Sequence, residues 1–160
     1  MTEPTAPSSG ATPPGATPKP TAILFVDDEP DNVELTAQIL RDALEVEVIV
    51  TASVEEAVAV LQSRPIRIVV MDLFVPLGDH PHRVLGPRAR RYQEHVDHLG
   101  GLVLLEEIER LPRVPIVVSH TACTDSVLHE LFGDRVERQI PKPAPVDTLL
   151  NALLELVRAD

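Results

Sequence analysis

AILFVDD (residues 22–28) is the most informative segment of the sequence, because five apolar residues run directly into two aspartates. IRIVVMD (residues 66–72) follows a similar pattern and ends in a single aspartate. Nearly continuous apolar runs of this length are typical of strands that are buried on both faces of a parallel sheet. Ligand sites in such sheets lie beyond the carboxyl ends of the strands. We therefore expect Asp27, Asp28 and Asp72 to meet at one edge of the sheet.

Helix-like and strand-like patterns alternate around these two stretches. Pro30 begins a helix whose apolar residues share one face, and Ser53 with Glu56 forms a capping box before a second helix. The other expected elements are strands at about 46–50, 114–120 and 135–140 and helices at about 101–111, 124–132 and 145–158. Five strands that alternate with helices predict an α/β protein with a parallel sheet, right-handed crossovers and helices on both faces.

The composition limits the class of protein to which the chain belongs. Of its 160 residues, 44% are hydrophobic, and the net charge of −11 argues against nucleic-acid binding through a broad basic surface. No apolar stretch approaches the roughly 18 residues that span a bilayer, so we expect no membrane contact. A single cysteine and the lack of a secretory signal predict a cytoplasmic protein. Residues 1–20 contain six prolines and predict a disordered tether, followed by one domain at 21–160.

Lys142 is the only lysine outside the first 20 residues, although the chain has twelve arginines. Its ammonium group is a compact charge that suits a phosphoryl oxygen, and it follows a predicted strand, as the three aspartates do. Converging carboxylates repel one another unless a hard cation joins them, and Mg²⁺ accepts oxygen ligands of this kind. A carboxylate beside Mg²⁺ can attack phosphorus in line and form an aspartyl phosphate. The alternative interpretation is that strand-end aspartates only cap the following helices.

Five short motifs occur along the chain in the order Phe25–Glu29, Val69–Asp72, Val75–Pro76, Thr121–Ala122 and Lys142–Pro143. Together they resemble the receiver domain of two-component response regulators, and the likeness covers about residues 21–158. The resemblance implies a flavodoxin-like fold with strand order 2-1-3-4-5 and a cis peptide bond before Pro143. It also implies a phosphoacceptor protein rather than an enzyme, which receives its phosphoryl group from a sensor histidine kinase or a histidine phosphotransfer protein.

The resemblance also implies a role for each site residue. Asp72 would be the phosphoacceptor, and Asp28, Asp72 and the main-chain carbonyl of Phe74 would bind Mg²⁺. Asp27 would act mostly through a metal-bound water, and Lys142 would pair with the phosphoryl group.

A hydroxyl group would complete the site. Thr121 is our first choice for it, although it falls about one residue later after Pro115 than the family pattern expects. Ser119 is the alternative.

Two features depart from the family pattern. Gln139 occupies the position, three residues before the lysine, at which the family often has an aromatic switch residue. An insertion at about 78–99 holds four of the six histidines and a local arginine cluster. We interpret this insertion as a solvated extension, and the alternative is a Zn²⁺ site that includes His95 and His98.

Three functions remain open at this stage. The first is a phosphoacceptor that signals by contact with a downstream protein. Such a protein could form a homodimer through its last helix. The second is a phosphorylation-independent interaction module with the same fold. The third is a phosphatase of the haloacid dehalogenase type, although its usual Asp-x-Asp signature differs from the adjacent Asp27 and Asp28.

Overall fold

The computed structural model describes residues 22–79, 99–132 and 135–159. The tether predicted at 1–20 lies outside the described residues. So does most of the insertion predicted at 78–99, including the histidines of the zinc alternative. Within the described residues, no helix combines the length and the apolar character that crossing a membrane requires.

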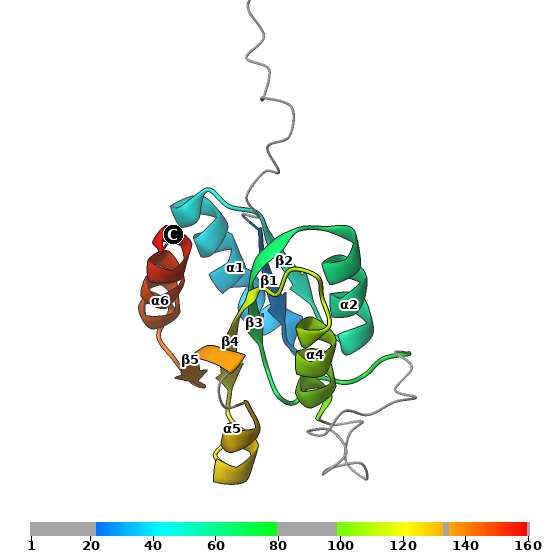
Figure 1. Ribbon diagram of the computed structural model, residues 1–160. Helices are drawn as coiled ribbons and strands as arrows, with labels where there is room; N and C mark the ends of the chain where they lie inside the picture. Colours follow the sequence, from blue (N-terminus) through cyan, green and yellow to red (C-terminus); the bar gives the residue numbers. More distant parts are fainter. Residues whose placement is uncertain (1–21, 80–98, 133–134, 160) are drawn as a thin grey trace, which may run out of the picture.

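Five parallel strands form one sheet in the order β2-β1-β3-β4-β5, which is the predicted flavodoxin-like order (Figure 1). The strands are β1 (Ala22–Val26), β2 (Val48–Thr51), β3 (Ile66–Met71), β4 (Ile116–Thr121) and β5 (Val136–Pro141). The order turns back on itself between β1 and β3, where the chain passes from one half of the sheet to the other. Ligand sites of doubly wound sheets lie at this kind of position.

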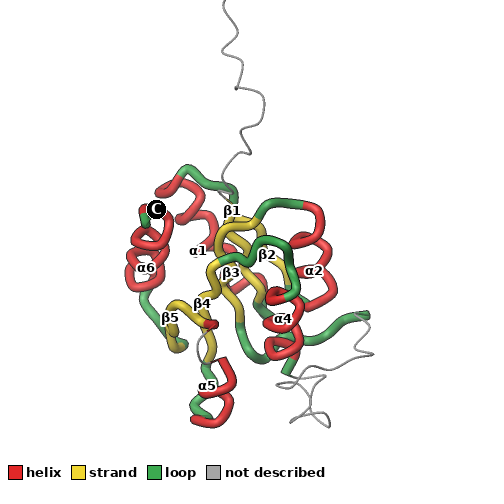
Figure 2. The backbone as a smooth tube through the Cα atoms, in the orientation of Figure 1, coloured by secondary structure: helices red, strands yellow, loops and turns green. Residues whose placement is uncertain are grey.

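Helices cover both faces of the sheet (Figures 1 and 2). The helices are α1 (Pro30–Leu44), α2 (Val54–Ser63), α4 (Gly100–Glu109), α5 (Ser126–Phe132) and α6 (Val146–Arg158). Alternate residues of β1 point to opposite faces, so Ile23 and Phe25 pack with α1 and α6 in one core. Leu24 and Val26 pack with α2 and α4 in the other. Burial on both faces explains why β1 is apolar at every position.

The predicted starts of α1 and α2 are confirmed, with one local difference. Pro30 is the first residue of α1, and the Ser53 hydroxyl accepts a hydrogen bond from the Glu56 backbone N–H at 3.2 Å. The Glu56 carboxylate reaches back to the N–H of Ala52 at 2.8 Å, one residue earlier than a standard capping box requires.

The start of β4 differs from the prediction by two residues. The strand begins at Ile116 instead of 114, and Val114 is 44% exposed. Proline has no N–H to donate to a neighbouring strand, so Pro115 favours a start after it.

Candidate functional site

The three aspartates meet at the carboxyl edge of the sheet, as predicted. Val26 and Met71 are register partners on β1 and β3, so the residues that follow them leave the sheet side by side. The Asp72 N–H donates to the Val26 carbonyl at 2.9 Å, which extends this pairing one step beyond the strands. Oxygen atoms of Asp27, Asp28 and Asp72 all lie within 4.8 Å of one another.

Lys142 joins this group from the end of β5. Its Nζ atom donates to Asp27 Oδ2 at 2.5 Å and to Asp72 Oδ2 at 2.8 Å. The Lys142 backbone N–H donates to the carbonyl of Thr121 at 3.0 Å, which anchors the loop beside the end of β4. The Lys142–Pro143 peptide bond is cis, as the resemblance implied. Residues that are 115 positions apart in the sequence therefore form one partly buried ionic cluster.

The second oxygen of each buried aspartate is held by its own loop. Asp27 Oδ1 accepts a hydrogen bond from the Glu29 N–H at 2.9 Å, and Asp72 Oδ1 accepts one from the Phe74 N–H at 3.1 Å. Asp27 and Asp72 are only 3% and 4% exposed, whereas Asp28 is exposed. The two buried carboxylates are thus fixed in orientation, and Asp28 borders solvent.

The charges in the cluster do not balance. Partial burial, followed by the negative charges of Asp72 and Asp27, raises the pKa of Asp28 above its ordinary value. Burial by itself would lower the pKa of Lys142, but its hydrogen bonds to Asp27 and Asp72 outweigh burial and raise it. Lys142 is therefore a cation at neutral pH, and one positive charge faces three carboxyl groups.

This donor set fits Mg²⁺. The ion prefers hard oxygen ligands, and the cluster offers three carboxyl groups with excess negative charge. The exposed Asp28 leaves a route for a hydrated ion and for a phosphate group. Phe74, whose main-chain carbonyl is the fourth predicted ligand, follows Asp72 in the same loop, and its role remains a prediction.

Both candidate hydroxyl groups lie on β4, and the ring of the histidine between them bonds to the neighbouring strand β5. Ser119 and Thr121 are each 2% exposed and border a common cavity with Gln139 of β5. The His120 ring bonds through Nδ1 to the carbonyl of Ile140 at 2.8 Å. Ser119 pairs with Met71, before Asp72, whereas Thr121 ends its strand and contacts Lys142 through the backbone. This placement favours Thr121, and the choice remains a prediction.

A chain of hydrogen bonds leads from Thr121 to α5. The Thr121 hydroxyl accepts from the N–H of Cys123 at 3.3 Å, and the carbonyl of Cys123 bonds to His129 Nε2 at 2.7 Å. His129 could not be predicted from the sequence, because a lone histidine on a short helix carries no local signal of this contact.

Two glycines that the sequence analysis also missed position the Asp72 loop. Gly100 and Gly101 begin α4, and their N–H groups donate to the carbonyls of Val75 at 2.9 Å and Leu73 at 3.1 Å. A Cβ atom at Gly100 would lie 2.1 Å from the Val75 oxygen, and one at Gly101 would lie 2.7 Å from the Cα atom of Leu73. Only glycine permits this approach. The Gly100–Gly101 pair after the insertion was the available sequence signal.

Comparison with solved structures places this architecture among known folds. A signal receiver domain of a putative LuxO repressor protein from Vibrio parahaemolyticus matches with a TM-score of 0.66 and 16% identity, over 87% of this chain and 91% of that chain. A CheY-like response regulator receiver domain protein from Methanospirillum hungatei JF-1 matches with a TM-score of 0.65 and 18% identity, over 86% and 94%.

The BeF3-activated N-terminal receiver domain of RstA from Klebsiella pneumoniae matches with a TM-score of 0.62 and 21% identity, over 86% and 98%. This chain has the receiver-domain fold. No family model and no curated protein matches the sequence. At identities this low, the receiver-domain likeness establishes the fold, and the function is argued from the site.

Proposed function

We propose that this protein is the phosphoacceptor of a two-component or phosphorelay signalling system and that it is phosphorylated on Asp72. One observation carries the proposal: Asp27, Asp28 and Asp72 have oxygens within 4.8 Å of one another, and Lys142 Nζ lies 2.8 Å from Asp72 Oδ2. The receiver-domain fold supports the same role. The proposed donor is a sensor histidine kinase or a histidine phosphotransfer protein, which acts in the cytoplasm.

The transfer forms one bond and breaks one. A carboxylate oxygen of Asp72 attacks the phosphorus atom of the phosphohistidine, the P–N bond breaks, and the imidazole leaves with its electron pair. Asp28, Asp72 and the Phe74 carbonyl would hold Mg²⁺, with Asp27 acting mostly through a metal-bound water, and the ion would supply positive charge that offsets the charge on the phosphoryl oxygens. Lys142 exchanges Asp72 Oδ2 for a phosphoryl oxygen and keeps its contact with Asp27. The protein acts as an acceptor and does not turn over a substrate.

The phosphoryl group is proposed to change the surface near α5. When the Thr121 hydroxyl turns to donate to a phosphoryl oxygen, it weakens the contact that the Cys123 N–H makes with it. The Cys123 carbonyl bonds to the His129 ring, so this movement reaches α5. It does not need an aromatic residue at position 139, where this chain has glutamine. A downstream protein would then recognise the altered face, through a shift between two existing conformations.

Intact mass spectrometry after incubation with acetyl phosphate and Mg²⁺ tests the proposal. The wild-type protein should gain one phosphoryl group, and Asp72→Asn should gain none. Asp79→Asn is the matched control, because Asp79 is exposed and its recorded contact uses the backbone N–H. Equal labelling of Asp72→Asn and wild type would refute Asp72 as the acceptor. Repeated turnover of small phosphate esters would instead indicate the phosphatase.

A further inference from the structure

A cleft lies at the amino edge of the sheet, at the far end of the domain from the aspartates. Its walls are Leu61 from the last turn of α2, Ile66 at the start of β3, and Leu111 and Pro115 on either side of the turn between α4 and β4. The cleft has a volume of about 220 Å³, which is many times the space that one water molecule needs. Its lining is mostly apolar, so an ordered water cluster is a poor occupant.

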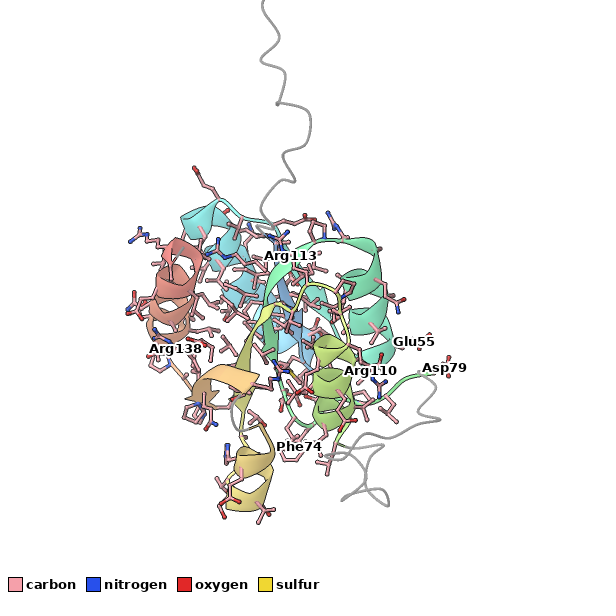
Figure 3. The ribbon with its side chains drawn as sticks, in the orientation of Figure 1. Glu55, Phe74, Asp79, Arg110, Arg113 and Arg138 are labelled. Carbon is pink, nitrogen blue, oxygen red and sulfur yellow. The ribbon has the colours of Figure 1, made fainter. Side chains whose placement is uncertain are left out.

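Two arginines stand at the rim of this cleft. Arg64 forms an ion pair with Glu47, and both side chains remain about half exposed, at 46% and 48%. Arg113 is exposed and makes no ion pair within the described part of the chain. Figure 3 shows Arg113 at the opposite end of the domain from Phe74, which lies in the Asp72 loop.

A purely structural role explains Arg64 better than Arg113. Arg64 follows α2 directly and complements the partial negative charge at the end of that helix. Arg113 lies four residues beyond the end of α4, where the helix dipole has largely faded. Among the residues that the structure describes, its guanidinium therefore has neither a carboxylate partner nor a helix end to complement, although it borders an apolar cleft.

Three prolines restrict the backbone of the cleft walls. Pro65, Pro112 and Pro115 all line the cleft, and each proline has a fixed φ angle. A preformed surface loses little conformational entropy when it binds a partner. These features distinguish the cleft from a gap beneath a mobile loop.

From this cleft we infer a docking site for a partner polypeptide that presents an aliphatic side chain next to a carboxylate. The aliphatic group fills the space between Leu61, Ile66 and Leu111, and the carboxylate pairs with Arg113. This site is separate from the proposed phosphoacceptor and does not depend on it.

Residues 1–20 and a second copy of the chain are poorer occupants. Residues 1–20 lack large aliphatic side chains apart from Met1, and Lys19 would place a positive charge close to Arg113. A symmetric dimer through the cleft would bring the arginines of both copies together, because a two-fold contact joins the same patch of each copy.

Nuclear magnetic resonance of the methyl-labelled full-length protein tests the inference with the peptide acetyl-Glu-Leu-Glu-amide. The methyl signals of Leu61, Ile66 and Leu111 should shift saturably, with a dissociation constant no tighter than about 1 mM, because one buried aliphatic anchor and one exposed ion pair supply little binding free energy beyond the cost of association. Acetyl-Gln-Leu-Gln-amide should bind about fivefold more weakly.

Charge-reversal variants show whether the acidic peptide binds at the cleft or responds to positive charge elsewhere on the surface. Arg113→Glu should weaken binding of the acidic peptide about tenfold, which corresponds to about 1.4 kcal/mol. Arg158→Glu is the matched control, because Arg158 is also exposed and unpaired among the described residues but does not line the cleft. It should leave the dissociation constant unchanged. Asp72→Asn should also bind normally, so failure of the phosphoacceptor proposal would leave this result intact.

Four outcomes of the titrations would overturn the inference. They are the absence of saturable shifts, equal affinity for the two peptides, normal binding by Arg113→Glu, and shifts of residues 1–20 that accompany those of the cleft. The last outcome would make the chain's own N-terminal segment the occupant. A sedimentation mass that rises with protein concentration and falls in Arg113→Glu would make a second copy the occupant and would overturn the inference as well.

Discussion

The two edges of the sheet use charged residues in opposite ways. At the carboxyl edge, Asp27 and Asp72 are almost fully buried and share one ammonium group. At the amino edge, Arg67 donates to the carbonyls of Leu156 and Ala159 at the end of α6, and Arg41 donates to the carbonyl of Val48. Charges that are satisfied one by one hold the fold together. Charges that converge with an unequal sum cost stability and are typical of a functional site.

Removal of Lys142 should give the largest difference in the free energy of unfolding between variants at the two edges. Lys142→Met leaves two buried carboxylates without their cation, so it should lower the free energy of unfolding by about 2 kcal/mol at pH 7 without divalent ions. Urea denaturation measures this quantity.

Arg64→Met is the matched variant, because it removes a half-exposed ion pair at the amino edge. It should cost no more than about 0.5 kcal/mol. Equal losses in Lys142→Met and Arg64→Met would contradict the contrast between the edges.

Addition of Mg²⁺ should stabilise the carboxyl edge selectively, because the cluster of three carboxylates found among the described residues lies there. At a concentration ten times its dissociation constant, a ligand that binds only the folded state raises the free energy of unfolding by about 1.4 kcal/mol. Asp28→Asn should reduce this gain, whereas Asp79→Asn should retain it. Thermal denaturation with and without Mg²⁺ provides the measurement, and an equal gain in both variants would remove Asp28 from the ligand set.

Arg67→Gln should have a smaller effect, at the amino edge alone. The guanidinium donates at 3.2 Å and 2.8 Å to carbonyl groups at the end of α6, so its loss should cost about 1 kcal/mol. Hydrogen exchange should speed up in the last turn of α6 and remain unchanged around Asp72. Faster exchange around Asp72 would show that the two edges are coupled.

The pH dependence of stability should give the smallest effect. A folded-state pKa of Asp28 above its ordinary value of 3.8 means that the charge on Asp28 costs stability above the raised pKa. This cost disappears as the pH falls through that pKa and below 3.8. Without Mg²⁺, Asp28→Asn should therefore be more stable than wild type at pH 7, by at most about 0.5 kcal/mol. A less stable variant at pH 7 would reverse this sign.

Most helices and strands could be predicted from the sequence, because the residue patterns that mark them are local. Pro30 and the Ser53–Glu56 pair mark helix starts, and apolar runs that end in aspartate mark the strands of a two-faced sheet. The meeting of Asp28, Asp72 and Lys142 could be expected because parallel strands bring their carboxyl ends to one edge. The strand order itself came from the family resemblance.

The residues that reach the carboxyl edge could be predicted from the sequence, because strand ends are set by short-range patterns of apolar and polar residues. The atoms that meet there depend on how the elements pack. Asp27 Oδ2 accepts a hydrogen bond from Lys142 Nζ, whereas Asp27 Oδ1 accepts one from the Glu29 N–H. Position 100 must be glycine because the carbonyl of Val75 lies too close for a Cβ atom. His129 joins the network in the same way. These contacts depend on distances between elements, and packing sets those distances to within fractions of an ångström.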